Sequence, residues 1–241
     1  MGQKVNPIGF RLGGVYSWSS RWFLKHGQAY REALRQDATI RKFLRTRLKD
    51  AGLARIDIER SVNTLTVTLH CAKPGLIIGR GGQGAEALRA ELRKLVGSKV
   101  TVSVNIQEIE RANLSAALAV QAVVADIEKR IPFRRSIKSV LNRLNKAGAE
   151  GAKIVISGRL DGSEIARTEK VAQGKIPLHT IRAAVDYSRG AAFTTYGVVG
   201  VKVWVFGGAP LGRRSEEPIA GEPVARPHRR RQSANASSFG N

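Results

Sequence analysis

Three glycines and one arginine occupy the four consecutive positions Gly79, Arg80, Gly81 and Gly82. Glycine lets the backbone turn sharply, so peptide N–H groups and the start of a following helix can face an anion. Arginine adds a mobile positive charge. The stretch therefore predicts a phosphate-binding turn. The local sequence also leaves open a purely structural corner, in which glycine only relieves backbone strain and nothing binds.

A second stretch places several cations on one side of an expected helix that begins after Pro132. Because a helix turns by about 100° per residue, its basic residues fall opposite the apolar ones. The basic residues are Arg134, Arg135, Lys138 and Lys146, and the apolar ones are Phe133, Ile137, Val140, Leu141 and Leu144. Such a face can grip phosphates of one strand without reading its bases. A face that only contacts solvent is the alternative.

No aromatic ring is interleaved with these helix charges, and aromatic residues make up only 6% of the chain. We therefore expect the basic helix to bind RNA electrostatically, with affinity that falls as salt rises, more than by stacking on bases.

Nucleotide-dependent chemistry is not supported by the same glycines. Gly79 to Gly84 matches the pattern G-x-G-x-x-G, which requires a strand directly before it and an acidic residue about twenty positions later. The residues before it are too few for a strand, and Thr101 to Ile106 contains no acid. A P-loop is excluded because no Lys-Ser or Lys-Thr follows the glycines.

Catalytic and metal-binding constellations are also missing from the sequence. The four histidines (His26, His70, His179 and His228) are scattered, and Cys71 is the only cysteine. A single cysteine cannot form an internal disulfide or a thiolate zinc cluster. No serine or cysteine lies in a nucleophile elbow. The sequence predicts a protein that is not an enzyme and has no catalytic residue, metal or cofactor.

The overall charge points to an anionic partner. The 241 residues include 41 Lys and Arg against 19 Asp and Glu, a formal net charge of +22. Nucleic acid is the usual partner of such a chain, and an acidic membrane surface is the second. We expect no membrane association, because no run approaches eighteen apolar residues and the first residues lack the apolar core of a secretory signal. A cytoplasmic location follows.

The glycine turn lies within an expected α+β domain. Residues 37–51 predict a helix capped by Asp37, residues 56–59 and 65–69 alternate like strands, 84–95 predicts a helix and 100–106 a third strand. Each element has one apolar side, so we expect a three-stranded sheet with helices on one face. This order resembles the type II KH domain, an RNA-binding module whose G-x-x-G loop clamps a nucleic-acid backbone.

The basic helix belongs to a second expected α+β domain. Residues 110–130 predict another helix, and from Lys153 onward the apolar residues recur at every second position. We expect strands at 154–156, 164–172, 178–187 and 198–206. Two helices followed by these strands predict a mostly antiparallel sheet.

These patterns divide the chain into four parts. Residues 1–20 predict a basic arm, extended rather than helical, in which Lys4 and Arg11 contact RNA. A merely flexible terminus is the alternative that the composition leaves open. A type II KH domain is expected at 21–109 and the second α+β domain at 110–207. A disordered basic tail, rich in Gly, Pro, Ser and Arg, is expected at 208–241.

Motifs along almost the whole chain resemble the bacterial-type family of small ribosomal subunit protein three, a universal family of KH-domain ribosomal proteins. They match in order up to about residue 207. The matching stretches are residues 1–5 with Pro7 and 11–13, residues 74–82, residues 133–135, residues 157–160 with 164–169, residues 177–180, and residues 195–204.

The resemblance implies a structural constituent of the head of the small ribosomal subunit. Such a protein would bind 16S-type small-subunit ribosomal RNA and neighbouring ribosomal proteins, among them small-subunit proteins ten and fourteen. Its basic helix would line the messenger RNA entry channel and assist unwinding without ATP, a role that maps onto Arg134, Arg135 and Lys138. The resemblance implies a ribosomal location, in the cytoplasm or in an organelle.

One position and one stretch depart from the family pattern. Gly81 stands where the family more often has a charged residue, and residues from Gly207 onward match no pattern. The alternative to a ribosomal role is a free KH-domain regulator that binds selected messengers. Such a regulator would show strong sequence preference for RNA, whereas a ribosomal protein in isolation would show little.

Overall fold

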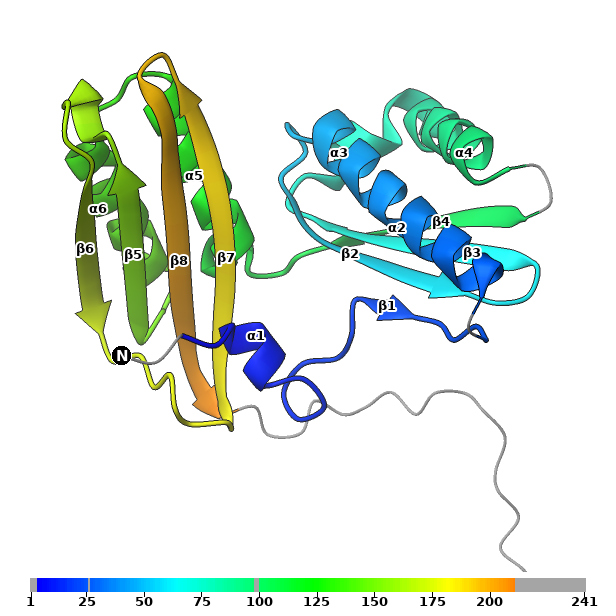
Figure 1. The fold of residues 1–241 in the computed structure, drawn as a ribbon, viewed down its shortest axis with the longest axis horizontal. Helices are drawn as coiled ribbons and strands as arrows, with labels where there is room; N and C mark the ends of the chain where they lie inside the picture. Colours follow the sequence, from blue (N-terminus) through cyan, green and yellow to red (C-terminus); the bar gives the residue numbers. More distant parts are fainter. Residues whose placement is uncertain (1–3, 26, 98–99, 211–241) are drawn as a thin grey trace, which may run out of the picture. The chain divides into compact units, whose positions relative to one another are not determined.

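A computed structural model describes residues 4–25, 27–97 and 100–210, which form two four-stranded sheets with helices packed on them (Figure 1). The disordered tail was expected at 208–241, but its first three residues belong to a strand that ends at Pro210. The rest of the expected tail, from position 211 onward, lies outside the described residues. No helix of the described part is long and apolar enough to cross a membrane.

The first sheet has the strand order β1-β2-β3-β4. Its strands are β1 (Ser20–Arg21), β2 (Leu53–Arg60), β3 (Thr64–Cys71) and β4 (Thr101–Glu108). β2 and β3 are antiparallel, whereas β1 pairs with β2 and β4 pairs with β3 in parallel. The sheet therefore has one strand more than the three expected. β1 contains only two residues, so it has no alternation of apolar and polar residues from which a strand could be predicted.

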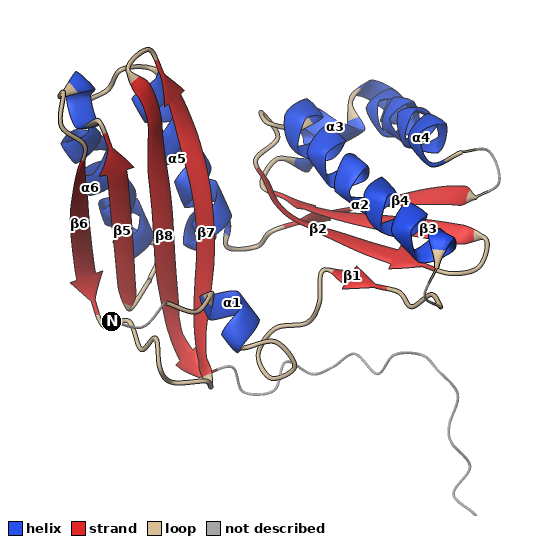
Figure 2. Ribbon diagram, in the orientation of Figure 1, coloured by secondary structure: helices blue, strands red, loops and turns tan. Residues whose placement is uncertain are grey.

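Three helices cover one face of this sheet, as expected (Figure 2). They are α2 (Gln28–Arg47), α3 (Pro74–Ile78) and α4 (Gln83–Val96). Apolar residues at helical spacing in α2 and α4, such as Ile40, Leu44 and Leu92, are fully buried against Leu65 and Leu69 of the sheet. This core fixes the start of α4, and hence the position of the glycine turn before it.

Asp37 has a different role from the helix cap that its position predicted. α2 begins nine residues earlier, at Gln28, and Asp37 lies buried in the middle of it. The Arg60 guanidinium of β2 donates to Asp37 Oδ1, at 2.8 Å from Nε. Trp22 donates its indole N–H to Oδ2, also at 2.8 Å. The carboxylate thus joins α2, β2 and the segment around Trp22.

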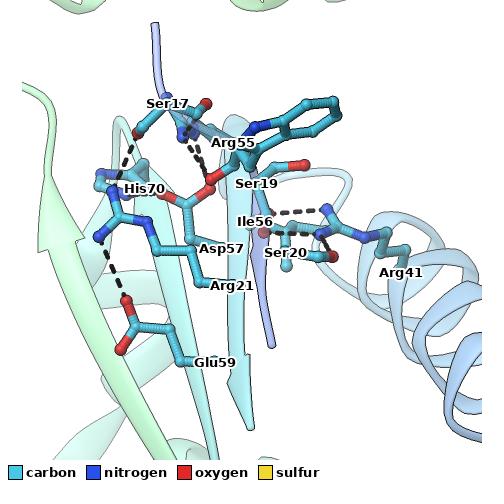
Figure 3. Close-up of polar contacts among 11 residues, drawn as sticks. Ser17, Ser19, Ser20, Arg21, Arg41, Arg55, Ile56, Asp57, Glu59 and His70 are labelled. Carbon is cyan, nitrogen blue, oxygen red and sulfur yellow. Dashed lines mark hydrogen bonds and ion pairs between the residues drawn. The ribbon is translucent and has the colours of Figure 1, made fainter. Parts of the chain in front are cut away.

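Two further arginines hold the segment before α2 on the edge of the sheet (Figure 3). Arg41 donates to Ile56 O at 2.7 Å and to Ser19 O at 2.8 Å, so it bridges β2 and the residues next to β1. Arg55 donates to Ser17 O at 3.3 Å and to Asp57 at 2.6 Å. Arg41 is one of several cations of α2, and its hydrogen bonds join elements of the fold.

The same network contains a contact between a histidine and a carboxylate, the only one among the described residues. His70 Nε2 lies 3.3 Å from Asp57 Oδ2. Burial alone would raise the pKa of Asp57, but the hydrogen bonds from His70 and Arg55 hold that pKa below its usual value. His70, which lies in β3, thus helps to hold this carboxylate.

The second sheet has the order β6-β5-β8-β7 and is antiparallel throughout. Its strands are β5 (Gly151–Gly158), β6 (Arg167–Gly174), β7 (Ala183–Thr194) and β8 (Gly197–Pro210). α5 (Ala116–Glu128) and α6 (Phe133–Lys146) pack on one face. A second α+β domain with two helices and an antiparallel sheet is therefore confirmed.

Two strands start later than their sequence pattern predicts, β6 at Arg167 and β7 at Ala183. Residues 177–180 do not join β7, because Arg11 binds their carbonyl oxygens. The guanidinium donates to the backbone oxygens of Pro7, Pro177, Leu178, Thr180 and Ala183, at 2.7 to 3.1 Å. These bonds hold the segment before β7 in a loop conformation.

Residues 4–20 are therefore not the extended arm that composition predicted. Pro7–Phe10 form a short helix, α1, and the backbone N–H of Ile8 donates to the capping oxygen Oδ1 of Asn6. Arg11 follows α1 and is only 1% exposed. Because its guanidinium is buried and fully engaged by carbonyl groups, it has no surface left for a phosphate. We therefore no longer include Arg11 among the expected RNA contacts.

Candidate nucleic-acid interface

The glycine turn joins α3 to α4 through backbone conformations that favour glycine. Gly81 (φ 61°, ψ 20°) and Gly82 (φ 82°, ψ −2°) are left-handed. Gly79 has φ 68° and ψ −173°, a region that is essentially restricted to glycine. The three glycines let the chain pass from α3 into α4 within four residues, and the Arg80 side chain is exposed.

The surroundings of these glycines separate a packing role from a binding role. A Cβ on Gly84, in the first turn of α4, would lie 2.5 Å from Ile77 O, so Gly84 permits close packing of α3 on α4. A Cβ on Gly81 or Gly82 would meet nothing within 4 Å. The corner therefore has a packing role at Gly84, and its outer side at Gly81 and Gly82 is open.

The start of α4 has no side-chain cap. Gly82 is the N-cap residue and makes no side-chain capping bond to the first turn. A helix N-terminus without such a cap favours an anion through its free N–H groups and its dipole. Arg80 forms no ion pair with any described residue, so its charge is available as well.

α6 has the two faces that its sequence predicts. Its apolar residues are buried in the core of the second domain, with Phe133, Ile137 and Leu144 at 3%, 1% and 1% exposure. Its basic residues are exposed, and the helix contains no acidic residue. The exposed basic residues are Arg134, Arg135, Lys138, Arg143 and Lys146.

Arg143 is the member of this face that the sequence reading missed. It lies eight residues after Arg135, which corresponds to about 80° around the helix and keeps it on the exposed side. The same helical spacing that selected the other four residues would have selected it. The described face thus carries one more positive charge than expected.

Arg134 differs from the other cations of α6 because the fold holds it in place. Its Nη2 lies 3.1 Å from Glu169 Oε1 of β6, and Arg167 Nε lies 3.5 Å from the same oxygen. Both guanidinium groups lie within 6 Å of the Phe133 ring centre, at 5.7 and 5.8 Å. The Arg134 hydrogen bond lowers the pKa of Glu169 and raises that of Arg134.

The remaining α6 cations have no such restraint. Arg135, Lys138, Arg143 and Lys146 form no ion pair with a described residue. Long, unpaired cationic side chains can follow a flexible polyanion, whereas a held arginine presents its charge at a fixed point. The face therefore combines one ion-paired arginine, Arg134, with four cations that form no ion pair with a described residue.

The described residues contain no group of three or more His, Cys, Asp or Glu residues that could hold a metal ion. Cys71 is fully buried, and burial raises the pKa of its thiol, so it resembles a small apolar core residue more than a nucleophile.

Comparison with known proteins identifies relatives for both halves. A family model described as KH domain matches residues 39–114, and one described as ribosomal protein S3, C-terminal domain, matches residues 123–205. The chain is similar to the small ribosomal subunit protein uS3 of Bacillus thuringiensis, Bacillus cereus and Bacillus anthracis. Each is 47% identical over 211 residues, which are 88% of this chain and 94% of the relative.

Proposed function

Because the chain belongs to the small ribosomal subunit protein uS3 family, we propose that it is a structural, RNA-binding constituent of the small ribosomal subunit. This is a family of ribosomal proteins of the small subunit. The KH domain and the second domain each present an exposed basic site, which supports binding to ribosomal RNA through both halves of the chain.

The more specific part of the proposal concerns α6. We infer that its exposed face lines the channel by which messenger RNA enters the subunit head, and that it assists ATP-independent unwinding. The observation that carries this inference is the exposed face itself, with five cations and no acid on the helix. A face of fixed sign can hold phosphates of an entering strand while its base-paired partner is peeled away.

Removing three charges from this face tests the inference. For the variant Arg134→Ala, Arg135→Ala, Lys138→Ala, we expect translation to slow more through a messenger hairpin than through unstructured messenger. The logarithm of the binding constant for single-stranded RNA falls linearly with the logarithm of the salt concentration. The magnitude of this slope should decrease by about 2, since each of the three lost phosphate contacts contributes about 0.7. Ribosome pausing at the hairpin and salt-dependent binding are the two measurements.

A matched control removes neutral side chains from the same face. Ser139→Ala with Asn142→Ala alters two exposed positions of α6 and leaves all of its charges in place. We expect this control to translate both messengers at the parental rate. Equal slowing of the charge variant on hairpin and unstructured messenger would contradict a role in unwinding.

The glycine turn is proposed to contact RNA backbone through the start of α4 and Arg80. Gly82→Asp should weaken this contact, because the new carboxylate stands in the open space where a phosphate would lie. The left-handed φ of Gly82 costs any other residue about 1–2 kcal/mol, which must be separated from the effect of charge.

Gly82→Asn provides that separation. Asparagine matches aspartate in size and tolerates the left-handed region, but it carries no charge. We expect ribosomal RNA to bind the aspartate variant several-fold more weakly than the asparagine variant at low salt. Equal affinities would show that the turn is a structural corner only.

The proposed surroundings of the chain follow from the same family. We propose that it lies in the head of the small subunit beside small-subunit proteins ten and fourteen. A free KH-domain regulator remains the competing hypothesis, and selection from random RNA pools separates the two. Strong enrichment of one short sequence by the isolated chain would favour the regulator, and weak enrichment favours the ribosomal role.

A further inference from the structure

The face of the second sheet that points away from α5 and α6 carries cations from all four strands. Residues that point toward the helices, such as Ile154 and Val203, are fully buried. Their neighbours in each strand point the other way. The register sets four of these outward residues in one row across the sheet, because Val155 is opposite both Lys170 and Lys202, and Lys202 is opposite Arg189.

This row is unfavourable for the isolated protein. Arg189 and Lys202 are directly opposite each other in an antiparallel pair, where like charges destabilise a sheet. Neither they, nor Lys153, nor Lys170 form an ion pair with any described residue. Outward positions in the described strands of this sheet hold no carboxylate. The repulsion is therefore left uncompensated within the described chain.

Aromatic rings lie in the adjacent row. Lys153 is opposite Trp204, and Trp204 is opposite Tyr187. The two ring centres are 5.1 Å apart, and Lys153 Nζ lies 5.6 Å from the Trp204 ring. Burial lowers the pKa of Lys153, and the nearby charges of Lys4 and Lys170 lower it further. An anion at this point would relieve that repulsion.

The two ends of this face differ. At one end the loop held by Arg11 covers it, since Ile176 and Leu178 pack on Val185 and Phe206. Toward the other end the face is uncovered, and Phe193 and Val198, which are opposite each other, are 72% and 55% exposed. Figure 1 shows α1 beside the covered end, with the helices α5 and α6 on the opposite side of the sheet.

We propose that this open face, formed by Lys153, Lys170, Tyr187, Arg189, Lys202 and Trp204, binds an unpaired segment of small-subunit ribosomal RNA. Three strand spacings of about 4.8 Å give the cation row a span of about 14 Å, which suits a few consecutive phosphates. The aromatic row beside it offers a surface for bases, as aromatic residues on the sheets of other RNA-binding modules do. The identity of the RNA rests on the proposed function.

The open face and the α6 face lie on opposite sides of one sheet. The second domain can therefore hold ribosomal RNA on its sheet side while its helix side grips messenger. Because the two ligands use different residues, neither competes with the other. The charge of the open face would also allow an acidic protein partner. The crosslinking experiment below distinguishes that partner from RNA.

The first experiment compares three full-length variants in their binding to small-subunit ribosomal RNA at several salt concentrations. Lys170→Ala with Arg189→Ala and Lys202→Ala should bind at least tenfold more weakly near physiological salt. The slope of its log binding constant against log salt concentration should be smaller in magnitude by about 2, because three single-strand contacts contribute about 0.7 each. The conservative variant Lys170→Arg with Arg189→Lys and Lys202→Arg should bind like the parent.

The control removes the same number of charges from α2. Arg31→Ala with Arg35→Ala and Lys42→Ala changes three exposed residues of the KH half, and it should change affinity less than threefold. The open-face variant no longer has the Arg189–Lys202 repulsion, so it should resist urea unfolding at least as well as the parent. Measuring its unfolding therefore separates a loss of binding from misfolding. Open-face and control variants that bind alike would overturn the inference.

The second experiment identifies the occupant directly in assembled small subunits. Zero-length ultraviolet crosslinking should yield RNA adducts on the peptides that contain Tyr187 and Trp204. Crosslinks from these peptides to protein alone would overturn the inference and leave the proposed function intact. If the parent chain does not enter small subunits, the proposed function itself fails, so the two outcomes are distinguishable.

Discussion

Replacing Asp37 with asparagine is expected to lower the free energy of unfolding of the KH half by about 3–5 kcal/mol, the usual cost of removing one partner of a buried ion pair. The side chains of Asp37 and Arg60 are only 6% and 12% exposed. Asparagine cannot neutralise the guanidinium, which would stay buried beside Trp22 without a counter-charge. The loss should be seen by urea unfolding and by faster amide hydrogen exchange in α2 and β2.

Two comparisons isolate the buried pair. Asp50→Asn makes the same chemical change at an exposed position and should alter stability by less than about 0.5 kcal/mol. Combining Asp37→Asn with Arg60→Met removes both charges, and the double variant should lose less stability than the two single variants together. Additive losses would show that the pair is not coupled. Peptides of α6 serve as an internal reference, because they should exchange at the parental rate.

Replacing Arg11 with lysine is expected to release α1 and the loop at 177–180, with a loss of about 3 kcal/mol in local stability. Lysine keeps the charge but has three donors in place of a planar fork, and it cannot reach the five carbonyl oxygens that Arg11 binds. Each buried carbonyl left without a donor costs about 1–3 kcal/mol before relaxation. Hydrogen exchange should rise in peptides spanning 4–16 and 176–183, with little change in α2.

The matched control is Arg21→Lys, the same substitution at a side chain that is 52% exposed. We expect it to change stability by less than about 0.5 kcal/mol. Parental exchange rates in both peptides of the Arg11 variant would mean that the five bonds are not needed to hold α1. Because the loop covers one end of the open face, its release should also expose Val185 and Phe206 to solvent.

Regular elements were predictable where side chains repeat. The strands around Leu65 and Val203 and the helices around Leu92 and Ile137 have clear apolar periods, and all lie in the expected sheets and helices. Contacts between distant residues left no such signal. Arg11 and Asp37 look like an arm residue and a cap residue in the sequence, yet both are buried, because their partners lie elsewhere in the chain.

The candidate site shows the same division. The exposed side of α6 could be read from helical spacing, although Arg143 was overlooked. The restraint of Arg134 by Glu169 could not be read, since it depends on which strand of the sheet lies beside the helix. The open face was missed for a related reason: its cations stand alone in four separate strands, and only strand register sets Lys170, Lys202 and Arg189 in one row.

The bonds between Arg11 and its loop also have a consequence for biosynthesis. Arg11 and Ala183 are 172 residues apart in the sequence. At about 5–20 residues per second, roughly 10–30 s of synthesis separate the two residues. During that interval the KH half can fold, but α1 has no docking partner. A nascent chain that stops short of β7 therefore keeps its first helix undocked, and attachment of α1 marks a polypeptide that has been made at least as far as the start of β7.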